Sequence, residues 1–404
     1  MDLHNRRQAG PVILLALFFF AASFAARFAA VNQTAFANGW DSYFYINQTR
    51  AWVEEGQMHV PDASLIYPLL RLVYIVVGDY VLMYKVTVSL LASFFSVALF
   101  HVAWRWSGNL KTAVVIGSVG VFSPHLTYFA AQYPKNLLGL VLFLLLLLLT
   151  SRRATFWQAV LVVVNFFGHR VTAVVAFIYF VVHKLLARLR VPIVYVVITF
   201  LGILLAAGVF LPGLLSVFDV ERLNGIFSAR PQFAPLSFVR TFGPELLSTV
   251  WLAEILAMTL IFIFIFVYSA RRSFEQIDAR MTALLIALCI LIFPFFAWTP
   301  DGAAIRMFLV FVLLCPLLLT SDAFGIKHLY VAITIAATLI AGAGFSFRSY
   351  IPNRHDPPYD LYDQMAGQIQ RKVSPDSIEL IIAHKSLAEF IVYATRAEAM
   401  SWSP

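Results

Sequence analysis

The chain has 404 residues, of which 61% are hydrophobic and only 12% are charged, and its formal net charge is +8. Soluble domains carry about 25% charged residues, so the composition excludes a soluble protein and predicts a polytopic membrane protein. Its 2 cysteines, Cys289 and Cys315, lie inside apolar runs and predict neither a disulfide framework nor a zinc site. No basic stripe with interleaved aromatic residues lies outside the apolar runs, so we expect no nucleic-acid partner.

Eleven apolar runs predict transmembrane helices, because a span needs about 20 apolar residues. They cover residues 11–31, 80–104, 112–130, 136–150, 154–168, 170–187, 191–212, 247–268, 281–298, 303–320 and 328–346. The runs at 136–150 and 154–168 are short, which indicates tilted or broken spans. Residues 64–78 are also apolar, but Pro68 and Arg71 interrupt them, and we interpret them as an interfacial or re-entrant piece. The fold class is therefore an all-α polytopic membrane protein.

The positions of lysine and arginine predict the orientation, because cytoplasmic loops are enriched in both. With a cytoplasmic N-terminus, the inner loops hold 13 of the 29 basic residues but only 4 of the 21 acidic ones. The first loop (32–63), a second long loop (213–246) and the C-terminal segment then lie on the outer face. We assign residues 1–346 to a transmembrane domain and residues 347–404 to a small outer segment.

The outer C-terminal segment predicts a small α/β piece. Residues 357–373 and 385–394 have helical patterns, and residues 377–384 are rich in β-favouring side chains. A fragment of this size hardly buries a core alone. We therefore expect it to pack on the transmembrane domain or on the first outer loop.

Asp41 is the candidate catalytic residue. It lies in the stretch NGWDSYFYINQTRAWVEEGQ (38–57), between Trp40 and an aromatic run that includes Tyr45. One interpretation is that Asp41 is only the N-cap of an interfacial helix, since aspartate is favoured there. The functional interpretation is a general base, because a carboxylate against an aromatic wall loses water and gains basicity.

Several further polar residues fall on the same outer side of the predicted topology. The candidates for substrate binding are Tyr45, Glu54, Tyr133, Lys135, His169, Arg170, Asp301 and Arg306. Lys135 is suited to a lipid phosphate, although lysines also extend to the interface without a ligand. His169 and Arg170 join two apolar runs with almost no loop, and they are either a short polar turn or face a cavity. Arg306 is suited to clamping a phosphate with its planar fork, or it pairs with Asp301.

The first ~150 residues resemble the GT-C superfamily of integral membrane glycosyltransferases, which includes protein O-mannosyltransferases, aminoarabinose transferases of lipid A and oligosaccharyltransferases. The likeness rests on the early acid in WDSYFYINQTRAWVEEGQ, on the step Tyr67–Pro68, and on SPHLTYFAAQYPKNLLGLVLF, where a Tyr-Pro-Lys step opens the next span. Many members carry Asp-Glu in the first loop, whereas this chain has Asp41-Ser42. Glu54 or Glu55 is a candidate substitute for the second acid, and the need for a divalent metal stays open.

The resemblance implies a GT-C-like fold and an inverting glycosyltransferase. Such enzymes take a sugar from a polyprenyl-phosphate or polyprenyl-diphosphate carrier in the membrane and attach it to a lipid, glycan or protein acceptor on the outer face. Asp41 would deprotonate the acceptor, while Lys135, Arg170 and Arg306 stabilise the leaving phosphate. We accordingly expect an integral protein of a bacterial inner membrane, with its N-terminus in the cytoplasm and its C-terminus outside.

Three alternatives remain from the sequence. A flippase or transporter of lipid-linked sugars would also place cations in the membrane, but it should have broken helices in corresponding halves and a midplane site. A polysaccharide polymerase or ligase of another membrane fold would use the arginines of residues 213–246. The third alternative is a catalytically silent protein with a GT-C-like fold.

Overall fold

The structure is a computed structural model, and it describes residues 3–149, 154–186, 249–270, 278–297, 302–321, 357–372 and 385–395. Within these ranges the regular elements are all helices. Those of the first half are α1 (Leu3–Val31), α2 (Ser42–Glu54), α3 (Ile66–Val77), α4 (Tyr80–Ser107), α5 (Leu110–Phe122), α6 (Pro124–Gln132), α7 (Pro134–Leu148), α8 (Thr155–Gly168) and α9 (Arg170–Leu186). Those of the second half are α13 (Thr249–Ala270), α14 (Ala279–Ala297), α15 (Gly302–Leu314), the 3-10 helix η3 (Cys315–Thr320), α18 (Tyr359–Lys372) and α19 (Lys385–Thr395).

The described helices are those of an integral membrane protein. Two of them are long and apolar enough to cross a membrane, over Gly10–Val31 of α1 and Tyr80–Ser107 of α4. The pair α5 and α6 adds a third such span if it is counted as one. Six shorter apolar helices cover Ile66–Val77, Pro134–Leu148, Thr155–Gly168, Glu254–Tyr268, Ala279–Leu291 and Arg306–Thr320. The predicted total of eleven spans is not confirmed, since the runs at 191–212 and 328–346 lie outside the described residues.

The predicted span at 112–130 is broken, because the axes of α5 and α6 differ by 51°. The break falls at Ser123, which precedes Pro124 and is extended with ψ of 119°. A residue before proline disfavours the helical conformation, and the Ser123 hydroxyl then caps α6 by accepting from Leu126 N at 3.1 Å. Arg27 of α1 donates to the freed carbonyl groups of this corner, with Nη2 3.0 Å from the oxygens of both Gly120 and Ser123.

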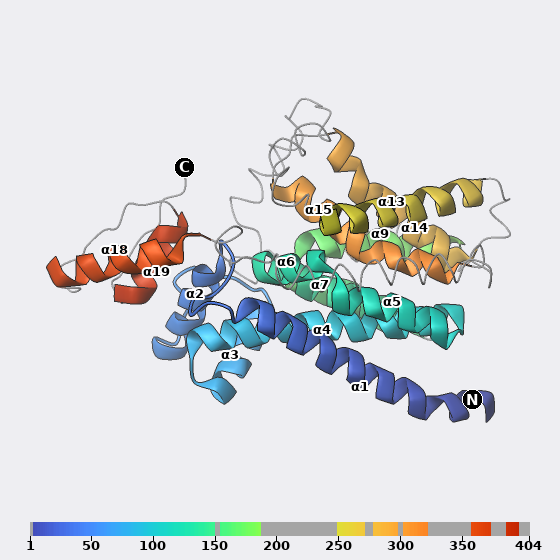
Figure 1. Cartoon of the computed structure of the whole chain (residues 1–404). Helices are drawn as coiled ribbons and strands as arrows, with labels where there is room; N and C mark the ends of the chain where they lie inside the picture. The colour runs from blue at the N-terminus through green and yellow to red at the C-terminus, as the bar shows by residue number, and fades with distance from the viewer. Residues whose placement is uncertain are drawn as a thin grey trace.

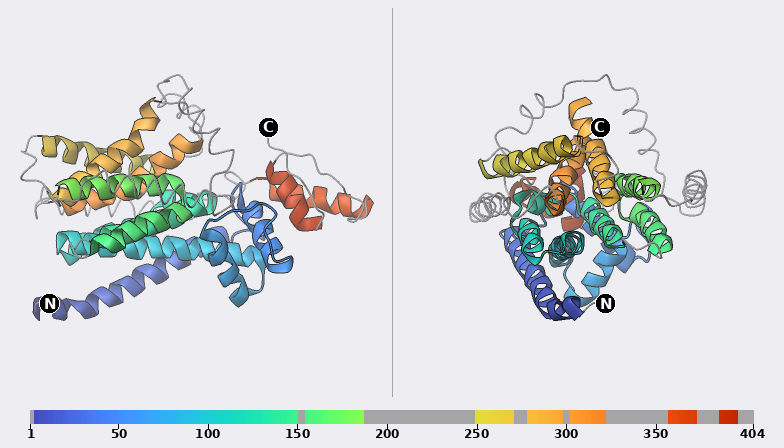
Figure 2. Two further views of the ribbon diagram at one scale, coloured as in Figure 1. Left: turned by 180° about the vertical axis from the view of Figure 1, so that it is seen from behind. Right: turned by 90° about the vertical axis from the view of Figure 1, so that its right-hand side faces the viewer.

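The elements of the outer loop and the C-terminal segment gather at one end of the helical bundle. In Figure 1, α2 and α3 lie beside α18 and α19 at the end of the molecule opposite the N-terminus, and the reverse view in Figure 2 agrees. Helix α19 packs on α2, and α18 packs on α19. The C-terminal segment therefore docks on the first outer loop. Its predicted strand at 377–384 and the predicted long loop at 213–246 lie outside the described residues.

The predicted interfacial or re-entrant piece at 64–78 contains the helix α3 of 12 residues, and its place relative to the membrane stays a prediction. It buries Tyr67 and Leu70, while Leu72, Ile75 and Val76 are exposed. Such an apolar face on an outer helix is suited to contact with lipid.

Candidate active site

Asp41 is positioned by a close contact between the first outer loop and the end of α6. Gly39 has a φ of 104°, and a Cβ atom at this position would lie 2.3 Å from the carbonyl oxygen of Ala131. Only glycine meets both conditions. The backbone N–H of Trp40 donates to Gln132 Oε1 at 3.1 Å. The loop is therefore held against α6, and α2 begins directly after Asp41.

The Asp41 carboxylate faces the C-terminal segment. Although Asp41 occupies the N-cap position of α2, its side chain makes no capping hydrogen bond. Instead, Oδ1 lies 2.7 Å from the Nζ atom of Lys385, at the start of α19. The same Nζ atom is 3.8 Å from Oε1 of Glu389. One ammonium thus lies between two carboxyl groups, and the interpretation of Asp41 as a mere cap does not fit this geometry.

Glu389 is buried, with only 5% of its surface exposed. Burial raises the pKa of its carboxyl group to about 8, although the positive charge of Lys385 acts against this shift. Asp41 adds to the increase, because two negative charges close together are unfavourable. At neutral pH this environment favours the protonated form of Glu389.

Ser42 holds the position at which the GT-C resemblance would often have a second acid. It is fully buried, and its hydroxyl lies 2.9 Å from the carbonyl oxygen of Gly39 and 3.1 Å from the hydroxyl of Tyr359 in α18. The Tyr359 hydroxyl also donates to the Gly39 carbonyl at 2.6 Å. A carboxylate here would be buried against carbonyl oxygens, so Ser42 packs the loop against the C-terminal segment.

Lys135 lies at the start of α7 and points toward the first outer loop. Its ammonium donates to Asp62 Oδ2. It also lies 5.4 Å from the ring centre of Tyr45 and 5.2 Å from that of Tyr67. Ring faces attract cations within about 6 Å. Two tyrosines and one carboxylate therefore keep a cation at the outer end of the helices.

Arg306 of α15 adds a second cation on a tyrosine ring. Its guanidinium carbon lies 4.6 Å from the ring centre of Tyr133. Tyr133 connects α6 and α7 and precedes Lys135 by two residues. The two cations thus approach the same corner from different helices. Asp301, predicted as a partner of Arg306, lies outside the described residues.

His169 and Arg170 form the corner between α8 and α9, as their position between two apolar runs predicted. His169 is extended, with φ of −160° and ψ of 130°, and ends α8. The corner packs on α7, because a Cβ atom at Gly139 would lie 3.0 Å from the Cβ atom of His169. Gly139 is one turn beyond Lys135, and the charge of Arg170 acts on Lys135. The first outer loop also reaches this corner, where Leu65 N donates to the carbonyl of Phe167 at 2.9 Å.

Tyr45 connects the two halves of the candidate site. It lies one helical turn after Asp41, whose carbonyl accepts from Tyr45 N at 3.2 Å. Burial raises the pKa of the Tyr45 hydroxyl, Asp41 raises it further and Arg306 lowers it. The structure therefore brings Asp41, Tyr45, Lys135 and Arg306 within electrostatic range of one another. Glu54 is at the far end of α2, where it accepts from the hydroxyl of Tyr80 at 3.0 Å.

Sequence reasoning missed Asp62, Lys385 and Glu389. Asp62 lies in a polar part of the outer loop, and no feature of the sequence around it indicated a contact with Lys135. Glu389 did have one, since it is a lone acid in the apolar helical stretch LAEFIV, four residues after Lys385. Such an acid usually has a partner in the fold.

The described residues contain no group of three or more His, Cys, Asp or Glu side chains that could hold a metal ion. The arrangement that they do contain is one carboxylate opposite a set of cations on aromatic rings. This combination is suited to removing a proton from one group while stabilising negative charge on another.

The arrangement of these helices is similar to that of solved membrane-protein structures. ArnT from Cupriavidus metallidurans bound to undecaprenyl phosphate matches with a TM-score of 0.64 and 14% identity, over 95% of this chain and 85% of that chain. The structure of the same protein in the apo state matches with a TM-score of 0.60 and 13% identity, over 95% of this chain and 85% of that chain.

A third solved structure is also similar in fold. The oligosaccharyltransferase from Archaeoglobus fulgidus, tethered to an acceptor peptide with an NVT sequon, matches with a TM-score of 0.59 and 12% identity, over 97% of this chain and 64% of that chain. No family model matches the sequence, and no curated protein matches it. These likenesses confirm the predicted helical fold, while the count of eleven spans and the α/β character of the C-terminal segment stay predictions.

Proposed function

We propose that the protein is a glycosyltransferase that moves a sugar from a polyprenyl-phosphate or polyprenyl-diphosphate carrier to an acceptor hydroxyl on the outer face of the membrane. The observation that carries this proposal is the convergence of Asp41 with Lys135 and Arg306 around Tyr45. The fold adds support, since one solved protein of this fold binds undecaprenyl phosphate.

The chemistry is an inverting displacement. The acceptor oxygen attacks the anomeric carbon and forms the new glycosidic bond, while Asp41 takes the proton of the hydroxyl. The bond between the anomeric carbon and the phosphate oxygen breaks, and its electron pair leaves with the phosphate. A phosphate leaves as an anion and needs cations rather than a general acid. Lys135, Arg170 and Arg306 would supply these positive charges, and preorganised charges of this kind are a large catalytic contribution in a site poor in water.

The C-terminal segment takes part through α19. Lys385 orients the Asp41 carboxylate, and Glu389 holds Lys385 from the buried side. When Asp41 accepts a proton from the acceptor, its negative charge disappears and Lys385 is left nearest to Glu389. Glu389 then ionises more readily, because Lys385 favours its charged form. Lys385 and Glu389 are positioning residues in this scheme, and Asp41 is the residue that contacts the reacting hydroxyl.

The test compares Asp41→Asn with the wild type in binding and in turnover. The variant should bind a polyprenyl phosphate as the wild type does, since the cations are unchanged, and transfer of sugar should fall by about 10²–10⁴-fold. Asp360→Asn, an exposed change on α18 outside the site, is the matched control and should leave both unchanged. Transfer at the wild-type rate by Asp41→Asn would refute the assignment of the base.

The proposed orientation is tested separately with single cysteines at positions 44 and 275 and a reagent that does not cross the membrane. Position 44, in α2, should be labelled in intact cells, and position 275 should be labelled only after the cells are opened. The opposite pattern would invert the topology and place the site in the cytoplasm.

A further inference from the structure

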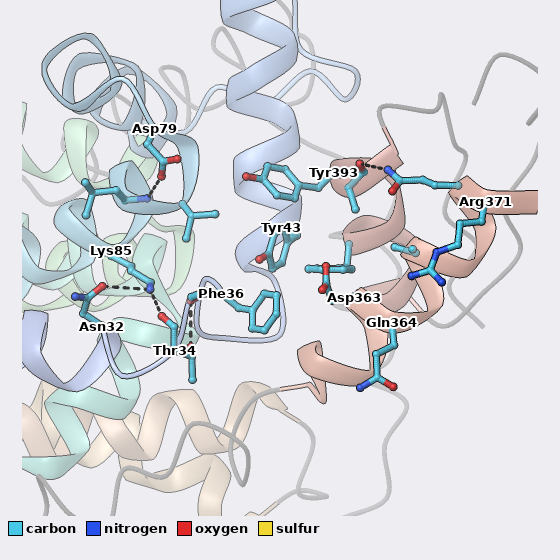
Figure 3. Close-up of a pocket in the computed structure, with 18 residues that line it drawn as sticks. Asn32, Thr34, Phe36, Tyr43, Asp79, Lys85, Asp363, Gln364, Arg371 and Tyr393 are labelled. Atoms are coloured by element: carbon cyan, nitrogen blue, oxygen red, sulfur yellow. Dashed lines mark hydrogen bonds between the residues drawn. The ribbon is translucent and has the colours of Figure 1, made fainter. Parts of the chain in front are cut away.

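A cavity lies between the first outer loop and the C-terminal segment, and its lining does not include Asp41. Its volume is about 820 Å³, within the range of ligand pockets. Figure 3 shows that its walls come from the loop after α1, from α2, from the start of α4 and from α18 and α19. Tyr43 lines this cavity, whereas Tyr45 contacts Lys135. Side chains two residues apart on a helix point about 200° apart, so the two sites are on opposite faces of α2.

The cavity contains a buried ammonium group. Lys85 of α4 is 3% exposed, and its Nζ atom donates to Asn32 Oδ1 at 3.4 Å and to the carbonyl oxygen of Thr34. An ammonium has three donors, so these two neutral acceptors leave one. Within the described chain, Asp79 attracts Lys85 only at longer range and forms no ion pair with it. A buried charge of this kind is costly without a counter-charge, and an anionic oxygen would supply it.

The cavity lies at the ends of two candidate membrane spans. Its floor is formed where α1 ends and α4 begins, and these are the two described helices that are long enough to span a membrane. Asp79, at the rim, follows the exposed apolar residues Ile75 and Val76 of α3 by only a few positions. An apolar surface beside a polar cavity at this depth fits a lipid, whose chains and headgroup meet there.

The remaining lining residues indicate what kind of headgroup fits. Phe36 and Tyr43 supply ring faces, and Arg371 supplies a second cation near the opening. Asp79 and Asp363 are two exposed carboxylates, and carboxylates can accept hydrogen bonds from a ligand. One oxygen of Asp79, Oδ1, already accepts from Leu82 N at the start of α4. The cavity therefore offers cations to a phosphate and acceptors to N–H or O–H donors on the same ligand.

We propose that this cavity binds the headgroup of an outer-leaflet phospholipid, with its phosphate on Lys85 and its amine or hydroxyl groups on Asp79 and Asp363. The proposal does not depend on the glycosyltransferase activity, because its ligand, its residues and its readout are different. A bound lipid would tie the outer loop to α18 and hold the C-terminal segment at the membrane surface.

The experiment is native mass spectrometry of the purified full-length protein, titrated in detergent with phosphatidylethanolamine, phosphatidylglycerol or phosphatidylcholine of matched chains. The first two lipids have headgroup donors and should bind more tightly than phosphatidylcholine, which has none. Lys85→Gln should weaken binding of all three by about tenfold, the effect of losing one charged contact of about 1.4 kcal/mol. Lys111→Gln, an exposed lysine at the start of α5, is the control and should have no effect.

Two exposed changes keep the test decisive if Lys85→Gln fails to fold. Arg371→Gln should weaken binding of the three lipids, and Asp363→Asn should reduce the preference for phosphatidylethanolamine over phosphatidylcholine. Equal binding of the three lipids by the wild type, unaffected by either change, would overturn the proposal. Displacement of lipid by inorganic phosphate at comparable concentration would show that the site takes a soluble phosphate, and would overturn the assignment to a lipid.

Discussion

Two groups of charged residues, one inside the helical bundle and one at its outer end, are built in different ways. In the inner group, Arg27 donates to three carbonyl oxygens at the break between α5 and α6. Nearby, His125 Nδ1 lies 2.5 Å from Oε2 of Glu254, and their side chains are 1% and 0% exposed. In the outer group, Lys385 and Asp41 pair side chain to side chain, and they are 40% and 33% exposed.

The difference shows how a structural charge and a candidate functional charge are held in one fold. The carbonyl groups that bind Arg27 are fixed by the backbone, and no ligand can replace them without unfolding the corner. The ion-pair partners Asp41 of Lys385 and Asp62 of Lys135 are partly exposed side chains, so a substrate can displace these two carboxylates at small cost. We therefore expect changes in the inner group to lower stability and changes in the outer group to lower activity.

The largest predicted effect is a loss of stability in Arg27→Met. The change removes the Arg27 hydrogen bonds to three carbonyl groups, of which that of Gly120 still accepts from Ser96 Oγ. It also leaves Glu254 with less positive charge near it, and the total cost is about 3–5 kcal/mol. The apparent unfolding temperature in detergent should fall by several degrees, and the specific activity of the protein that remains folded should be nearly unchanged. An unchanged unfolding temperature would contradict the conclusion that the inner group stabilises the fold.

The second prediction concerns the outer cations. Lys135→Met should lower sugar transfer by about 10²–10³-fold, as when one charge-stabilising group of an active site is removed. Arg306→Ala should lower the affinity for polyprenyl phosphate, measured by the same titration used for the wild type. The unfolding temperature should change little for Lys135→Met, since the lost ion pair with Asp62 is partly exposed. If Lys135→Met transfers sugar at the wild-type rate and Arg306→Ala binds the carrier with wild-type affinity, both cations have only a structural role.

The sequence predicted those parts of the fold and site that depend on local patterns. Hydropathy located α1 and α4, because an apolar stretch of sufficient length is a property of consecutive residues. Charge asymmetry grouped Asp41, Lys135 and Arg306 on one side, and the structure brings these three together. The Ser123–Pro124 step was a local signal for the break in the span at 112–130, but the apolar run on both sides outweighed it.

The remaining parts depend on contacts between distant segments. Lys385 meets Asp41 although 344 positions separate them, and no periodicity within either segment encodes that pairing. The role of Ser42 also depends on a distant contact, since its buried hydroxyl lies 3.1 Å from the hydroxyl of Tyr359 in α18. A family pattern suggested a missing acid at this position, and tertiary packing explains why an uncharged residue stands there.

A third and smaller effect is expected at Lys385. Lys385→Gln removes the cation that orients Asp41 but leaves the carboxylate in place, so transfer should fall by about tenfold, the equivalent of 1.4 kcal/mol. The effect should appear in kcat more than in KM, because the phosphate-binding cations are untouched. Lys385→Arg should recover most of the activity, since it keeps a positive charge at the same place. A loss that is equal for glutamine and arginine would indicate a packing role only.

The smallest effect is a dependence on pH that belongs to Glu389. Burial raises the pKa of its carboxyl group from the usual 4.5 to about 8 in the folded protein. Between these two values the folded state binds more protons than the unfolded state, so docking of α19 loses free energy as the pH rises through this window. Above about pH 8 the loss is complete, and below about pH 4.5 there is none.

The pH dependence is measured by amide hydrogen exchange of residues 385–395, corrected for the intrinsic rate at each pH. In the wild type, protection of α19 should decrease between pH 6 and pH 8.5, and in Glu389→Gln it should stay nearly constant, because the amide keeps its charge at zero. The charged groups that face Glu389 are Asp41 and Lys385, and the buried hydroxyl of Tyr45 is also within range. A decrease of the same size in Glu389→Gln would refute the assignment of this pH dependence to Glu389.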